Sequence, residues 1–359
     1  AEVCALVARA RRQGKHLRAI GAGHSFNDLS LCEDLLVDLR QLTGVVAIDP
    51  EHHTVRVRGG TPLKHLIPEL TRAGLALANI GAWTEQTIAG VVSTATHGTA
   101  GRHRRSLIDS VVGLRLVDGT GAVQVLEGDA LHFVTLGYFG VITEVTLRCE
   151  PFFHVRQDKL VMDGSEAIAA IDELLHRHDF VDLRWAGRAA KIIVGRWDIV
   201  PTAPTLRDRL ARGLEGVQIG AINRLLALVR VDVLPTPVRR GLFDGLASAY
   251  VTTGRGLPHE TTWHDGLTFN SFGVAAPHEE REFALSRERA AACLLAVRDL
   301  MRTDRSAAGV EIQVRFSQPT PLRLAPNEGR DTVWFNINSL DLAGTSALVA
   351  RLSSLALQH

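Results

Sequence analysis

The stretch that decides the fold is Gly21-Ala22-Gly23-His24-Ser25, which follows a short strand predicted over residues 16–20. Two glycines one residue apart let the backbone turn tightly and point successive N–H groups at one spot. Such a turn can bind a pyrophosphate, although glycine-rich turns are often only structural. Phe26 stands where the Rossmann dinucleotide pattern has a small residue. A nicotinamide-binding loop is therefore disfavoured and stays an alternative.

Two further segments have a composition suited to binding a polar ring system. Residues 86–99 have the sequence QTIAGVVSTATHGT, which concentrates hydroxyl groups, small side chains and glycines. Residues 136–143, LGYFGVIT, form a glycine-bounded turn that leads into a strand predicted over 141–148. Small residues allow close approach to the backbone, and hydroxyls offer hydrogen bonds. Each segment alone is weak evidence for a site.

Around these segments, apolar periodicity predicts a mixture of helices and short strands. A half-buried strand is expected over 54–58 and a hairpin over 114–126. A helix begins near Thr61-Pro62 and contains Pro68, so we expect a kink or an early stop there. Residues 1–150 thus form an α+β domain and show no regular βαβ array.

The composition changes after Pro151, and a length of 359 residues itself predicts two domains. We expect a second domain over residues 151–340 and a C-terminal helix within 341–359 that could return to the first domain. The elements expected in the second half are helices over 168–175, within 201–237, over 286–302 and over 346–357, and strands over 282–285, 310–316 and 332–337.

The overall composition excludes several classes of protein. Hydrophobic residues make up 46% and charged residues 22%, which is typical of a globular chain. Forty basic residues against 39 acidic ones leave no field that would attract nucleic acid. Four widely spaced cysteines predict neither a disulfide framework nor a metal site, and they favour a cytoplasmic protein. No apolar run is long enough to predict a membrane span, and nothing fixes the oligomeric state.

In their order and spacing, the three glycine-containing segments resemble the flavin domain of the vanillyl-alcohol oxidase (p-cresol methylhydroxylase-type, PCMH-type) family. Within that family the chain is most similar to the sugar-1,4-lactone oxidases and alditol oxidases. The resemblance covers roughly residues 1–150 and returns at 282–337. It implies a two-domain α+β FAD flavoprotein, with an α+β cap domain that contains an antiparallel sheet.

The resemblance also implies which residues hold the cofactor. The Gly21 to Ser25 loop would cradle the FAD pyrophosphate, and His24 matches the family histidine that is bonded covalently to the flavin. The alternative for His24 is a histidine that only hydrogen-bonds a neighbouring loop, and His97 has an equivalent structural alternative. The full implied set of cofactor-binding residues is Gly21, Ala22, Gly23, His24, Ser25, Phe26, Gly90, Thr94, Thr96, His97, Gly98 and Ile142.

The catalytic residues implied lie on the predicted strand at residues 310–316, which resembles the family cap strand. Arg315 matches the family arginine and would stabilise the anion that develops during oxidation. Gln313 occupies the position of the family glutamate, and an amide cannot act as a general base. Glu311 lies two residues earlier, on the same face of a strand, and could substitute for it. The family's C-terminal His-Trp-x-Lys segment has no counterpart in this sequence.

The function implied is that of an FAD-dependent oxidoreductase acting on a CH–OH group. Its substrate would be a sugar lactone, an alditol or a sugar-like metabolite, with hydride transfer to flavin N5 and molecular oxygen as the expected acceptor. One alternative is a flavoenzyme of specialised metabolism acting on another CH–OH or CH–NH substrate. The others are an NAD-dependent dehydrogenase and a non-catalytic flavin-binding protein.

Overall fold

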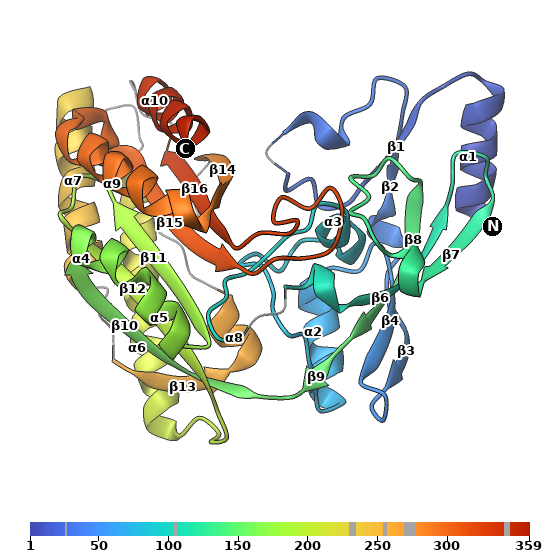
Figure 1. The fold of residues 1–359 in the computed structure, drawn as a ribbon, viewed down its shortest axis with the longest axis horizontal. Coiled ribbons are helices and arrows are strands. Elements are labelled where there is room, and N and C mark those ends of the chain that lie inside the picture. The colour runs from blue at the N-terminus through green and yellow to red at the C-terminus, as the bar shows by residue number, and fades with distance from the viewer. Residues whose placement is uncertain (26, 104–105, 230–234, 254–256, 269–277, 341–344) are drawn as a thin grey trace. The chain divides into compact units, whose positions relative to one another are not determined.

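The computed structural model describes residues 1–359 except 26, 104–105, 230–234, 254–256, 269–277 and 341–344 (Figure 1). The chain divides into two compact units. Unit 1 comprises Ala1–Gly98, Arg105–Phe152 and Pro319–Gly329, and unit 2 comprises Thr99–Arg104, Phe153–Gln318 and Arg330–His359. The C-terminal helix, for which we considered a return to the first domain, therefore belongs to unit 2.

Unit 1 is built on a five-stranded antiparallel sheet with the strand order β3-β4-β8-β6-β7. A parallel pair, β1 and β2, and a short antiparallel pair, β5 and β9, lie outside this sheet. The elements of unit 1 are α1 (Glu2–Arg12), β1 (Leu17–Ile20), β2 (Leu35–Asp38), β3 (Val45–Asp49), β4 (Thr54–Arg58), α2 (Leu63–Arg72), β5 (Leu75–Ala76), α3 (Ile88–Ser93), β6 (Val111–Val117), β7 (Val123–Glu127), β8 (Val141–Arg148) and β9 (Glu150–Pro151).

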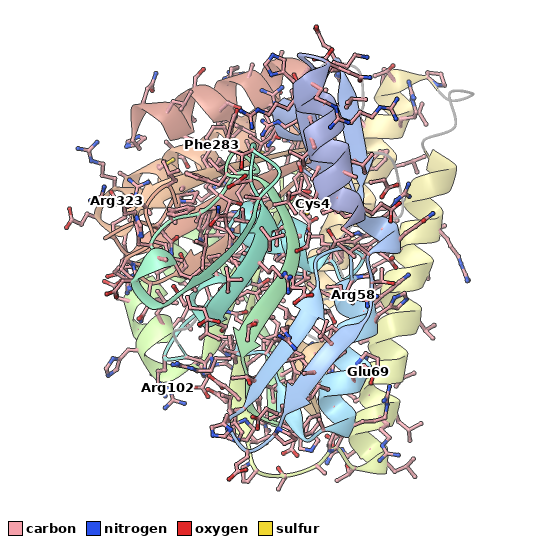
Figure 2. The ribbon with its side chains drawn as sticks, turned by 90° about the vertical axis from the view of Figure 1, so that its right-hand side faces the viewer. Cys4, Arg58, Glu69, Arg102, Phe283 and Arg323 are labelled. Atoms are coloured by element: carbon pink, nitrogen blue, oxygen red, sulfur yellow. The ribbon has the colours of Figure 1, made fainter. Side chains whose placement is uncertain are left out.

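The predicted strand over 54–58 and the predicted hairpin are both present. Val55 and Val57 of β4 are fully buried, whereas the side chain of Arg58, labelled in Figure 2, is exposed. β6 and β7 form the hairpin. Of the two alternatives expected at Pro68, a kink or an early stop, the early stop is wrong, because α2 continues to Arg72. The apolar face of α2 is buried on both sides of the proline, and this packing holds the last turn in place.

One segment from late in the chain completes unit 1. Thr320 donates a hydrogen bond from Oγ1 to Oδ1 of Asp109 at 2.7 Å. The backbone of Arg323 pairs in both directions with the segment at 132–134, since its N–H donates to the carbonyl of His132 and its carbonyl accepts from the N–H of Val134, each at 2.8 Å. The segment Pro319–Gly329 is thus tied to unit 1 by side-chain and backbone bonds.

Unit 2 contains a seven-stranded antiparallel sheet with the strand order β13-β10-β12-β11-β15-β16-β14. The elements of unit 2 are β10 (His154–Asp163), α4 (Gly164–Ala169), α5 (Ile171–Arg177), β11 (Phe180–Ala186), β12 (Lys191–Val200), α6 (Leu206–Val229), α7 (Thr236–Thr253), β13 (His259–Thr262), α8 (Trp263–Leu267), β14 (His278–Ser286), α9 (Arg287–Thr303), β15 (Val310–Ser317), β16 (Thr332–Leu340) and α10 (Thr345–Gln358).

The two faces of this sheet differ in character. One face packs against α4, α5, α9 and α10 and forms a large apolar core (Figure 1). Because side chains alternate along a strand, the other face carries the even-numbered residues of β11 and the odd-numbered residues of β15. Helix α7 packs on part of that second face, where Phe243 and Ala247 contact Ala186 and Ile193. The single helix expected over 168–175 is divided into α4 and α5 at Ala170.

Candidate functional site

The loop that follows β1 forms the centre of a groove in unit 1. Gly23 has a φ of +69°, a conformation that glycine adopts without strain. Gly21 lies against Thr87 so closely that a Cβ at Gly21 would be 2.1 Å from Thr87 Oγ1. Only glycine therefore fits at position 21 with this arrangement of the two segments.

The groove brings together residues from all three of the segments that the sequence singled out. It is lined by the loop Gly21 to Ser25, by one face of α3 and its flanks, and by the turn before β8. The predicted cofactor-binding residues among its lining are Gly21, Ala22, Gly23, His24, Ser25, Gly90, Thr94 and Ile142. The three segments are thus neighbours in space, although more than 100 residues separate the first from the last.

Three predicted residues lie outside the lining of this groove. Thr96 Oγ1 is 3.1 Å from Thr94 Oγ1, and the buried ring of His97 contacts the carbonyl of Gly98 through Nδ1 at 2.8 Å. A Cβ at Gly98 would lie 2.2 Å from Asn79 Oδ1, so packing within unit 1 accounts for this glycine. The remaining predicted residue, Phe26, falls outside the described residues.

Thr87 is a groove residue that the sequence reasoning did not select. Its Oγ1 is buried and has no hydrogen-bond partner among the described residues. Thr87, Gly90, Val91 and Thr94 all line the groove, at the spacing i, i+3, i+4, i+7 of one helix face. The sequence analysis did not predict a helix over residues 88–93. Such a prediction would have shown that Thr96, His97 and Gly98 come after the helix and are not part of this face.

These features fit the phosphates and polar ring atoms of FAD. The loop has a tight glycine turn whose backbone N–H groups can face an anion, and Thr87 offers a buried hydroxyl whose hydrogen bond is still to be made. The half-buried ring of His24 stacks on Trp83, with ring centroids 5.7 Å apart and planes inclined at 19°. This contact orients the histidine within the lining of the groove.

The predicted catalytic residues lie on β15 in unit 2. Val310, Ile312, Val314 and Phe316 point into the apolar core, and the residues between them face the opposite way. Glu311, Gln313 and Arg315 therefore share the second face of the sheet, as the spacing predicts. Glu311 and Gln313 are 3% and 1% exposed, so this face holds polar groups that water barely reaches.

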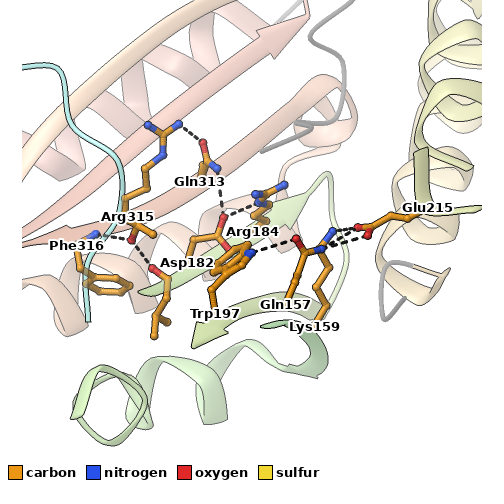
Figure 3. Close-up of polar contacts among 11 residues, drawn as sticks. Gln157, Lys159, Asp182, Arg184, Trp197, Glu215, Gln313, Arg315 and Phe316 are labelled. Atoms are coloured by element: carbon orange, nitrogen blue, oxygen red, sulfur yellow. Dashed lines mark hydrogen bonds and ion pairs between the residues drawn. The ribbon is translucent and has the colours of Figure 1, made fainter. Parts of the chain in front are cut away.

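A chain of contacts joins these residues to the neighbouring strand β11 (Figure 3). Arg315 Nη2 donates to Gln313 Oε1, and Gln313 Nε2 donates to Asp182 Oδ2 at 3.3 Å. The same Asp182 oxygen accepts from Arg184 Nε at 2.7 Å. Asp182 and Arg184 are 1% and 3% exposed, so their ion pair lies in a low-dielectric environment.

The surroundings of Arg184 keep it charged. Burial by itself would lower the pKa of the guanidinium, but the nearby Asp182 carboxylate raises it, and the net pKa lies above the usual range. Burial raises the pKa of Tyr250, on α7, to about 12. Tyr250 is therefore neutral at physiological pH, and Arg184 is a permanent cation beside it.

A second polar cluster lies on the same face and lines a cavity of about 700 Å³. Lys159 forms an ion pair with Glu215 of α6, and Gln157 Nε2 donates to the same carboxylate at 3.1 Å (Figure 3). Trp197 Nε1 donates to Gln157 Oε1 at 3.0 Å. Burial lowers the pKa of Lys159, although the Glu215 carboxylate opposes this effect. The cavity also reaches Arg184 and has the size of a small-molecule site.

The sequence reasoning missed Asp182, Arg184 and Lys159. A signal was present, because Asp182-Leu183-Arg184-Trp185 alternates charged and apolar residues, the pattern of a strand with one apolar face. The alternation gave no reason to expect that both charges would be buried.

Comparison with known proteins identifies the family. Residues 1–127 match the model of an FAD-binding domain, and residues 145–349 match the model of D-arabinono-1,4-lactone oxidase. The second match covers more than half of the chain. The chain belongs to the D-arabinono-1,4-lactone oxidase family. It is therefore an FAD-dependent oxidoreductase with the PCMH-type two-domain α+β fold, which confirms the expected family, fold and cofactor and decides against the nicotinamide alternative.

Individual relatives of this lactone oxidase family member agree with the assignment. The chain is 30% identical to an L-gulono-1,4-lactone dehydrogenase of Mycobacterium tuberculosis over 344 residues, which cover 94% of this chain and 77% of the relative. It is 26% identical to the L-gulonolactone oxidase of Mus musculus, with coverages of 94% and 76%. Among solved structures, a variant of cholesterol oxidase from Brevibacterium sterolicum has a similar fold, with a TM-score of 0.71 at 15% identity and coverages of 98% and 77%.

Two further observations concern the described part of the chain only. Within it, no helix has both the length and the apolar character needed to cross a membrane. The same residues contain no group of three or more histidine, cysteine, aspartate or glutamate side chains placed to hold a metal ion.

Proposed function

We propose that this chain oxidises a CH–OH group of a sugar-1,4-lactone and that molecular oxygen is the electron acceptor. The observation that carries the proposal is the buried polar face of β15, where Arg315, Gln313 and Glu311 lie together in a member of this family. The relatives named above act on sugar lactones according to their names, which supports this substrate class over alditols.

The groove residues hold the cofactor in this proposal. The Gly21 to Ser25 loop binds the pyrophosphate through backbone N–H groups, and Thr87 donates its buried hydroxyl. When bound, FAD supplies a two-electron acceptor for the hydride that leaves the substrate carbon. His24 carries a covalent link to the flavin, a role that its position in the groove lining supports.

The β15 residues act on the substrate oxygen. Arg315 donates hydrogen bonds to it and stabilises the negative charge that develops as the hydride leaves. The amide of Gln313 accepts hydrogen bonds but is not a base, so it cannot take the proton of the substrate hydroxyl. Glu311 is the carboxylate on the same face, and we assign it the role of proton acceptor.

Anaerobic reduction of the bound flavin tests the substrate class. The purified chain is mixed with L-gulono-1,4-lactone, D-arabinono-1,4-lactone and an alditol such as xylitol, and the visible absorbance of the flavin is followed. We expect the lactones to bleach the flavin and air to restore the colour with release of peroxide. Bleaching by the alditol alone would refute the lactone assignment, and bleaching that only an artificial dye reverses would refute oxygen as the acceptor.

A non-catalytic flavin-binding protein is the second candidate, and Gln313 favours it because the family position of a base is filled by an amide. The same experiment decides between them, since a non-catalytic protein would stay yellow with every substrate. We also place the protein in the cytoplasm, because its four cysteines are free and such thiols persist in a reducing compartment.

Acid precipitation tests the covalent link. Colour that stays in the protein pellet shows a bond, and its loss in His24→Ala assigns the bond to His24. The variant His65→Ala is the matched control, because His65 is an exposed histidine on α2, outside the groove lining. Colour released from the wild-type protein would refute the link.

A further inference from the structure

Gln313 lies between a carboxylate and a guanidinium, and its amide satisfies both. Its Oε1 accepts from Arg315 Nη2, and its Nε2 donates to Asp182 Oδ2 at 3.3 Å (Figure 3). A glutamate at this position could accept from Arg315 but has no proton for Asp182 when ionised. The two carboxylates would then meet at hydrogen-bond distance, where they cannot both be charged at little cost.

The charged groups around this contact also disfavour a second carboxylate at position 313. The charged groups near Asp182 and Gln313 come from β10, β11, β14, β15 and α6, and Tyr250 of α7 is neutral. Glu280 of β14 accepts from Nδ2 of Asn336, which lies opposite Gln313 on β16. The cations of this group are Lys159, Arg184 and Arg315, and its carboxylates are Asp182, Glu215, Glu280 and Glu311. An additional carboxylate at position 313 would add a buried negative charge to a group that already contains these carboxylates.

The neighbouring strand β12 is shaped to receive Asp182. A Cβ at Gly195 would lie 2.2 Å from Asp182 Oδ1 and 2.4 Å from the ring of Trp197. The missing side chain of Gly195 therefore leaves the space that one carboxylate oxygen occupies. The other oxygen accepts from Arg184 of the same strand at 2.7 Å and from Gln313 of β15 at 3.3 Å.

We propose that Asp182 is a positioning residue for oxidation: it fixes the Gln313 amide in one orientation, and the amide holds the Arg315 guanidinium ready for the substrate oxygen. The carboxylate of β11 thus acts on Arg315 through two hydrogen bonds in series, by way of the Gln313 amide. The inference rests on the proposed function for the reaction itself, but the contacts behind it are independent of the substrate.

A reciprocal exchange tests the proposal. Asp182→Asn leaves a neutral acceptor and removes one buried negative charge, and Gln313→Glu creates the carboxylate contact and adds one buried negative charge. The double variant carrying both changes restores one carboxylate, one amide and the wild-type net charge across the same contact. Asp172→Asn is the matched control, because Asp172 is a surface carboxylate of unit 2 with a side chain 83% exposed.

For the lactone oxidation, we expect each single change to lower kcat/KM by about 10- to 100-fold, since small displacements of a catalytic group have effects of this size. The double variant should be at least tenfold more active than the product of the two single effects. Gln313→Glu should also show an acid-side ionisation in its pH profile about 1 to 2 pH units above that of the double variant. A residue that only stabilises the sheet would not move this ionisation.

Stability against pH gives a readout that needs no substrate. In Gln313→Glu the facing carboxylates raise a folded-state pKa above its unfolded value, so stability relative to wild type should fall as the pH rises from about 4 to about 7. Adding Asp182→Asn should remove this fall. Effects that simply multiply in the double variant, or a pH-dependence that persists in it, would overturn the proposal. If no lactone reduces the wild-type flavin, the proposed function fails, and the stability measurement still decides the role of Asp182.

Discussion

Replacing Gly21 with alanine tests the link between the glycine loop and flavin binding. The new Cβ would lie 2.1 Å from Thr87 Oγ1 and 3.3 Å from Thr87 Cβ, so one of the two segments must move. Overpacking of this kind costs about 1–3 kcal/mol. If the whole cost falls on the loop conformation that binds the cofactor, the dissociation constant of FAD rises about 5- to 150-fold.

The measurement is best made in the His24→Ala background, where a covalent link through His24 cannot form and binding is reversible. FAD is titrated into the apoprotein, and the quenching of flavin fluorescence reports the dissociation constant. Gly119→Ala is the matched control, because Gly119 lies in the β6–β7 turn of the same unit and a Cβ there would contact nothing within 4 Å. If Gly21→Ala binds FAD as tightly as Gly119→Ala, the loop is not the site of close approach.

Three more predictions concern stability and reactivity. Thr99 Oγ1 donates a hydrogen bond to a carbonyl of β11 and accepts one from an N–H of β15. Thr99→Val should therefore lower the free energy of unfolding by about 1–3 kcal/mol for each partner left unpaired. Urea denaturation measures this change, and an unchanged midpoint would contradict it. Hydrogen bonds from a threonine hydroxyl and a glutamine amide lower the pKa of Asp118 to about 2. The stability advantage of wild type over Asp118→Asn should therefore be complete at neutral pH and should disappear as the pH falls from about 4 to about 2. A difference in thermal stability that stays constant over this acidic range would count against it. Burial raises the pKa of Cys149 to about 12 and of Cys293 to about 11, so alkylation of the native protein at neutral pH, followed by mass spectrometry, should spare both and modify them only after unfolding.

The parts of the site that could be predicted from sequence are those set by local pattern. The alternation along residues 310–316 was enough to place Glu311, Gln313 and Arg315 on one face of a strand. The glycine loop after β1 was recognisable for the same reason, since a tight turn needs glycine at fixed positions. Both predictions depend on residues that are close together in the chain.

The parts that could not be predicted depend on contacts between distant segments. Nothing in the sequence near Asp182 indicates that Gln313, 131 residues later, donates a hydrogen bond to it in a buried contact. Thr96 was expected in the site and Thr87 was not for a similar reason, because a list of hydroxyl-bearing residues does not show which of them line the groove. The early stop considered at Pro68 does not occur, because that expectation took the intrinsic effect of proline without the burial of the helix face.

The late segment of unit 1, Pro319–Gly329, restricts how this protein can be dissected. A fragment cut after Phe152 would lack the strand-like partner of residues 132–134 and the hydroxyl that Asp109 accepts from. Such a fragment would expose backbone groups that the intact polypeptide keeps paired, so it should be prone to aggregation. Expression of the flavin half therefore requires that this eleven-residue insert be grafted back, and substitutions near position 320 should report on the cofactor half despite their place in the last fifth of the sequence.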